Sequence, residues 1–275
     1  MSYIMETILV ATNFSKTSDN AVTYSAHLAK LFKARLVLFN VFKLPVHASN
    51  TWVSVESMDA LIDAQKDKLR AQASRLSEEL DIEVDYECRL LDFEREIDSL
   101  MKVHEARFLV MGMSAKSMEQ NLMGNPTTTL ISMKKFPVLA VPVDAKFTGI
   151  DKILFACDLM QGIPLRTLVR LKQIAIGLKS EVTVFYVEKK LDELKAYNDI
   201  YAHIDKGLGN VVHLYKKVNS DDVIREIEKE IIKSNSNLLV MIPKTYGFWE
   251  SLIHRSKTRE MASGLNIPML SIPVD

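Results

Sequence analysis

The chain has 275 residues, of which 48% are apolar and 25% charged, a composition typical of a soluble globular protein. Its 35 lysines and arginines balance 35 aspartates and glutamates, so the formal net charge is zero. This argues against a nucleic-acid-binding protein, whose affinity comes largely from a basic surface. Cys88 and Cys157 form no Cys-x-x-Cys motif, which disfavours a disulfide scaffold or thiolate metal site and favours a reduced, cytoplasmic chain. Neither a signal peptide nor an apolar run of about 18 residues that would predict a membrane span is visible.

The first half of the chain alternates predicted strands and helices. A short apolar run at 7–12 predicts a buried strand, and apolar residues at Ala21, Tyr24, Leu28 and Leu31 then follow a helical period. Further strands are predicted at 35–42, 82–91, 107–111 and 137–142, and further helices at 56–80, 92–104 and 126–134. This order predicts a parallel sheet with helices on both faces and right-handed crossovers.

The second half repeats the same pattern. Strands are predicted at 152–157, 181–187, 210–217, 237–242 and 268–273, and helices at 164–179, 190–206, 221–234 and 255–264. Asp221 and Asp222 are expected to cap the third of these helices.

Three landmarks show that the halves are copies. The motif Ile-Leu-Val-Ala-Thr-Asn-Phe at 8–14 returns as Ile-Leu-Phe-Ala-Cys-Asp-Leu at 153–159. Phe-Leu-Val-Met-Gly-Met at 108–113 returns at 238–243, and Pro-Val-Leu-Ala-Val-Pro at 137–142 returns at 268–273. A repeat this long is a duplicated domain rather than a solenoid unit.

We therefore expect an α/β protein of two tandem Rossmann-like domains, 1–143 and 152–275, each with a five-stranded parallel sheet. The linker at 144–151 is too short to let the domains separate widely. We expect an intrachain pseudo-dimer in which the final strands of the two halves, 137–142 and 268–273, pair and cover exposed edges. The sequence leaves open whether whole chains form a further homodimer.

Candidate ligand-binding residues lie beyond the carboxyl ends of the predicted strands, where ligands of open parallel sheets bind. In the first half these positions are Ala11, Thr12 and Asn13 after the first strand, Val41 in the second, and Gly112 and Ser114 after the fourth.

A second group of candidates precedes the helix at 126–134. Gly124 and Asn125 come just before the first helical residue, and the N–H of Thr127 together with the helix dipole could hold a phosphate. The alternative is that Gly124 only turns the chain and Asn125 only caps the helix.

The joint pattern of Asn13 and Asp158 after the first strands, the glycine-containing loop, and the Pro-Val-Leu-Ala-Val-Pro strand resembles the universal stress protein family in tandem form. The resemblance covers nearly the whole chain and implies adenine nucleotide alpha hydrolase-like domains. It also implies a cytoplasmic stress-response protein. Some members of that family bind ATP or AMP, others bind no nucleotide, and many dimerise along the fifth strand.

The signature of that family, after the fourth strand, is Gly, two residues, Gly, nine residues and then Gly-Ser or Gly-Thr, and neither half of this chain matches it completely. In the first half Gly112 matches the first glycine, but Ala115 stands at the second, and Asn13 replaces an aspartate and so lacks its charge. In the second half Asp158 matches the aspartate, while Pro243 is interpreted as replacing the first glycine. Arg255 and Ser256 stand where the final pair would be, which makes Asp158 and Ser256 the nucleotide-site candidates of this half.

The sequence leaves two candidate functions. The first is an adenine-nucleotide-binding sensor that takes ATP or AMP, with Mg²⁺, mainly in the first half. The second is a protein-interaction module with degenerate sites that meets an unknown protein partner through the loop at 243–258 and the pseudo-dimer. No Gly-x-Ser-x-Gly, Gly-x4-Gly-Lys-Ser/Thr or His-Glu-x-x-His motif is present, so at most weak ATP hydrolysis is expected, with no metal site.

Overall fold

The computed structural model describes residues 6–42, 55–90, 93–113, 126–159, 162–188, 197–243 and 267–274. The chain divides into two compact units, Met1–Met113 and Ser114–Asp275. The second unit therefore contains the second repeat together with the last helix and strand of the first. The domain boundaries at 143 and 152 describe the duplication and remain a prediction.

The first unit alternates strands and helices as the sequence predicts. In chain order its elements are β1 (Thr7–Ala11), α1 (Lys16–Phe32), β2 (Arg35–Phe42), α3 (Val55–Leu80), β3 (Val84–Leu90), α4 (Phe93–Val103) and β4 (Ala106–Met113). The strands are parallel and lie in the order β3-β2-β1-β4. Every residue of β1 is buried, as expected for a strand with neighbours on both sides and helices on both faces.

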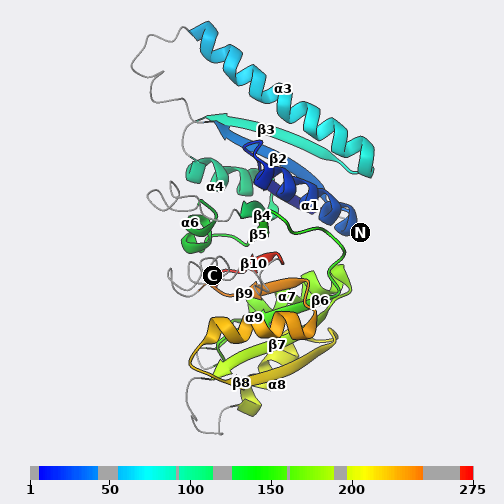
Figure 1. Ribbon diagram of the computed structural model, residues 1–275, viewed down its shortest axis with the longest axis vertical. Coiled ribbons are helices and arrows are strands. Elements are labelled where there is room, and N and C mark those ends of the chain that lie inside the picture. The colour runs from blue at the N-terminus through cyan, green and yellow to red at the C-terminus, as the bar shows by residue number, and fades with distance from the viewer. Residues whose placement is uncertain are drawn as a thin grey trace. The chain divides into compact units, whose positions relative to one another are not determined.

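Helices cover both faces of this sheet. Arg70 of α3 donates its Nε to the Tyr86 hydroxyl of β3 at 3.0 Å, and Tyr86 pairs in register with Leu38 of β2. The next residue along β2, Phe39, points to the other face, where its ring stacks on Phe93 of α4 with 6.3 Å between centroids. Helix α1 packs on β1 and β4 and against α3 (Figure 1), so α1 and α3 share one face and α4 lies on the other.

The second unit has the same alternation. In chain order its elements are α6 (Pro126–Met133), β5 (Val138–Pro142), β6 (Lys152–Ala156), α7 (Leu165–Leu178), β7 (Glu181–Glu188), α8 (Tyr197–Leu208), β8 (His213–Asn219), α9 (Val223–Ser234), β9 (Leu238–Met241) and β10 (Met269–Ser271). Strands β10-β9-β6-β7-β8 are neighbours in that order and all parallel. The predicted fold class, with a five-stranded parallel sheet in the second half, is confirmed.

Strand β5 extends this sheet from the other repeat. It pairs antiparallel with β10, with Leu139 opposite Leu270. The predicted pairing between the final strands of the two halves is therefore confirmed.

Two predicted elements of the second half differ from the structure or lie outside it. The strand predicted from 210 begins at His213, because Gly209 ends α8 in a left-handed conformation with φ of 58° and the chain turns before entering the sheet. Asp222 caps α9 as predicted, with its Oδ1 accepting from the Arg225 N–H at 3.2 Å. Residues 190–196 and the predicted helix at 255–264 lie outside the described residues.

Candidate nucleotide site at the carboxyl edge of the first unit

The carboxyl ends of β1, β2 and β4 meet at one edge of the first unit. Because β1 lies between β2 and β4, the strand order reverses there, which is where open α/β sheets bind ligands. This edge brings together five of the predicted site residues: Ala11, Thr12, Asn13, Val41 and Gly112.

Thr12 is the buried anchor of this edge. Its N–H donates to the Phe39 carbonyl at 2.9 Å, and its Oγ1 accepts from the Phe14 N–H at 3.1 Å. Phe14 has φ of 59°, uncommon for a bulky residue, and Lys68 of α3 lies 5.6 Å from the centre of its ring. The chain therefore leaves β1 through a sharp turn at Phe14, which is held by the hydrogen bond to Thr12 and by the contact of its ring with Lys68.

Serine side chains cap the helix that follows. Ser15 Oγ accepts from the Ser18 N–H at 3.3 Å, and Ser18 Oγ accepts in return from the Ser15 N–H at 3.0 Å. Asn13 adds its own cap, with Oδ1 accepting from the Ser15 N–H at 3.2 Å. The N–H groups of Ser15 and Ser18 therefore already donate to side-chain oxygens. A ligand at this end of α1 would contact side chains rather than these two backbone donors.

Asn40 is a candidate site residue that the sequence pattern did not single out. Its Nδ2 donates to the Thr12 carbonyl at 2.6 Å, and the residue is 6% exposed. Its Oδ1 is buried and has no hydrogen-bond partner among the described residues. A buried acceptor of this kind costs free energy unless a further partner satisfies it. The available signal was an asparagine inside the otherwise apolar run from Leu36 to Val41.

Gly112 has a packing role of its own. A Cβ at this position would lie 2.6 Å from the Thr17 carbonyl oxygen and 2.8 Å from Thr17 Cγ2, closer than real Cβ contacts. The glycine therefore lets the first turn of α1 lie directly against β4.

The second repeat has a corresponding edge with different residues. The Cys157 N–H donates to the Phe185 carbonyl at 3.0 Å, as Thr12 does to Phe39, so Asp158 stands where Asn13 stands in the first repeat. Strand register aligns Val110 with Val240, which places Ile242 at the position of Gly112. The interpretation that Pro243 replaces the first glycine is therefore wrong by one residue.

The remaining predicted site residues are only partly described. Thr127 lies in the first turn of α6 in the second unit and is 1% exposed. Ser114, Gly124, Asn125, Ser256 and the loop at 244–258 lie outside the described residues, so their roles stay predictions.

Two other features bear on chemistry. Cys88 lies beside Asn40 in the strand register. Burial raises the pKa of its thiol, and the positive charge of the nearby Lys66 offsets only part of this increase. At the outer strand β8, Asp205 Oδ1 accepts from the Tyr215 hydroxyl at 2.5 Å and lies 2.9 Å from His213 Nε2, and these hydrogen bonds lower the pKa of Asp205.

Neither a metal centre nor a membrane segment emerges from the described ranges. Within them, no three or more His, Cys, Asp or Glu side chains cluster to hold a metal ion. No helix of this part of the chain is both long and apolar enough to cross a membrane.

Comparison with known families now identifies the class of protein. The model of the universal stress protein family matches residues 5–142, half of the chain. The chain belongs to the universal stress protein family. A comparison with curated proteins gave no significant match.

Two solved structures with the same fold each match nearly the whole chain. A universal stress protein from Archaeoglobus fulgidus DSM 4304 matches 97% of this chain and 96% of its own, with 16% identity and a TM-score of 0.70. A protein of unknown function from Pseudomonas aeruginosa PAO1 matches 98% of this chain and 93% of its own, with 12% identity and a TM-score of 0.52. A family protein from Arabidopsis thaliana with AMP bound matches 50% of this chain and 91% of its own, with 14% identity and a TM-score of 0.35.

Proposed function

We propose that the chain is a cytoplasmic stress-response protein that binds an adenine nucleotide at the carboxyl edge of β1, β2 and β4. The observation that carries this proposal is the buried Asn40 Oδ1, an acceptor without a partner among the described residues, beside Thr12. Adenine and ribose both offer N–H or O–H donors that such an acceptor can bind. Family membership supports the proposal, since the resemblance to this family implies nucleotide binding in some members.

We propose that the other residues of this edge contact different parts of the nucleotide. Asn13 is exposed and uses its Oδ1 on the Ser15 N–H, so its side-chain NH₂ group is left for an acceptor on the ligand. Val41 is half-buried and offers an apolar surface to the base. Ser114, Gly124, Asn125 and Thr127 are proposed phosphate contacts, with Mg²⁺, from sequence alone.

Calorimetric titration of the full chain with AMP and with ATP, each with and without Mg²⁺, tests the proposal. These are the nucleotides that the family resemblance implies. We expect saturable binding that both Asn13→Ala and Asn13→Asp weaken, because a carboxylate can still cap Ser15 but offers no N–H to the ligand. Asn219→Ala, an exposed asparagine at the end of β8, is the matched control and should change nothing. Absence of any saturable heat with every nucleotide would refute the proposal.

A second candidate function is protein interaction, and one observation favours it. Helix α7 exposes Leu165, Val169 and Ile176 to 43%, 40% and 48%, all on one side of the helix. Exposed apolar ridges of this kind often mark a contact with a partner. Val169→Lys with Ile176→Lys should abolish recovery of a partner bound by the wild-type chain, and unchanged recovery would exclude this face.

A further inference from the structure

A pocket lies at the carboxyl edge of the second repeat. Strand β6 lies between β9 and β7, so the strand order of this repeat also reverses beside β6. The pocket has a volume of about 570 Å³, within the range typical of small-molecule sites. The residues that line it are Lys134, Gly162, Ile163, Pro164, Ile242, Pro243 and Val274.

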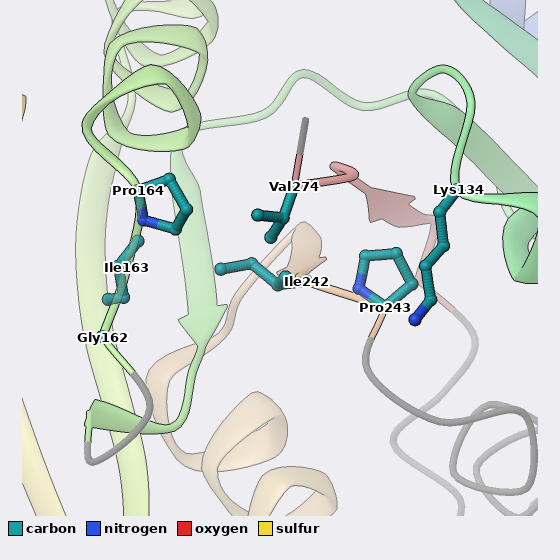
Figure 2. Close-up of a pocket in the computed structure, with 7 residues that line it drawn as sticks. All are labelled: Lys134, Gly162, Ile163, Pro164, Ile242, Pro243 and Val274. Carbon is teal, nitrogen blue, oxygen red and sulfur yellow. The ribbon is translucent and has the colours of Figure 1, made fainter.

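The duplication explains why the space is apolar here. In the first unit Gly112 lets α1 press against β4, whereas Ile242 carries a branched side chain at the same register position. Figure 2 shows the Ile242 side chain extending toward Ile163 and Pro164, with Val274 above the same space. Ile163 and Ile242 are 5% and 6% exposed and form the floor, while Val274 is 45% exposed at the rim.

The polar features of the pocket favour one negative charge. Pro164 is the N-cap of α7 and provides no side-chain hydrogen bond, so the positive end of this helix dipole borders the pocket without a capping side chain. Lys134 adds an ammonium group on the opposite side, beside Pro243 (Figure 2). The described lining residues include neither a carboxylate to repel an anion nor a hydroxyl to recognise a sugar.

We propose that this pocket binds a small monocarboxylate with an apolar hydrocarbon body. The hydrocarbon part packs on Ile163, Ile242 and Val274, where burial of apolar surface supplies the affinity. The carboxylate faces Lys134, and the hydrocarbon part extends across the pocket toward the start of α7 (Figure 2). This site is distinct from the proposed nucleotide site, because none of its lining residues is among the proposed nucleotide contacts.

The test is a titration of the full-length protein, labelled at isoleucine and valine methyl groups, with octanoate followed by NMR. We expect saturable shifts of the Ile163, Ile242 and Val274 methyl signals at millimolar octanoate, and weaker binding of octanol and of octylammonium. No saturable shift of these signals, or equal binding of octylammonium, would overturn the proposal.

Variants separate the charge from the apolar floor. Lys134→Gln should weaken octanoate binding by about two- to five-fold, the range of an exposed charge pair, and leave octanol binding unchanged. Val274→Asp places a negative charge at the exposed rim and should abolish octanoate binding. Lys229→Gln, which removes an exposed charge on α9, is the matched control. Octanoate binding by Lys134→Gln and Val274→Asp that equals binding by the control and by the wild-type protein would overturn the proposal. Loss of AMP binding concerns only the nucleotide site and not this pocket.

Discussion

Replacement of Gly112 by alanine tests how tightly α1 is held against β4. The new Cβ would lie 2.6 Å from the Thr17 carbonyl oxygen and 2.8 Å from its carbonyl carbon, so backbone atoms must move. Overpacking of this kind costs about 1–3 kcal/mol, while the lower entropy of the unfolded alanine chain returns about 0.4–1 kcal/mol. Because backbone atoms must move, we take the upper half of the overpacking range and subtract the entropy contribution. We therefore expect the free energy of unfolding of the first unit to fall by roughly 2 kcal/mol.

Native-state hydrogen exchange of peptides from α1 and β4 is the suitable assay, because a chain of two units need not unfold in one step. The double variant Thr17→Ala/Gly112→Ala should recover only part of the loss, since Thr17→Ala removes the Cγ2 contact at 2.8 Å and leaves the carbonyl contact. Gly112→Ala with protection equal to or greater than wild type would refute the packing argument.

Three further predictions concern stability and reactivity. Ser15→Ala removes the cap of α1 and should cost about 1 kcal/mol in chemical denaturation; an unchanged midpoint would mean that Asn13 alone suffices. The pKa of Asp205 is lowered in the folded protein, so its contribution is present above the unfolded pKa of about 3.9 and is lost as pH falls through the lower folded value. Asp205→Asn should therefore destabilise the protein at neutral pH and by less in acid, and a pH-independent difference would contradict this. Burial raises the pKa of Cys88, so its labelling by a thiol reagent at mildly alkaline pH should be slower than in the unfolded chain; equal rates, followed by peptide mass spectrometry, would exclude it.

The repeat, the fold class and most strands could be predicted because their signals are local. The apolar run of β1 and the final strand at 137–142 are short segments whose composition alone indicates burial. The pairing of β5 with β10 also followed from the duplication, since each final strand has an edge to cover.

The site could be predicted only in part, because its decisive contacts join residues far apart in sequence. Asn40 becomes informative only when the sheet places its side chain against the Thr12 carbonyl. The packing role of Gly112 depends on Thr17 of α1. The offset of Pro243 by one residue was already contained in the motif alignment of 108–113 with 238–243, and the strand register confirms that Ile242 stands at the position of Gly112.

The pairing of β5 with β10 means that the piece of chain that was copied is not the piece that packs together. A fragment beginning at Asp151 would carry a whole repeat, yet β10 would lose the neighbour that it has along one side in the intact protein. Its free N–H and C=O groups would then be open to any other strand, including β10 of a second fragment. Gene duplication has in this way produced two repeats that cannot be separated without exposing a strand edge, because β5 and β10 each cover the edge of the other.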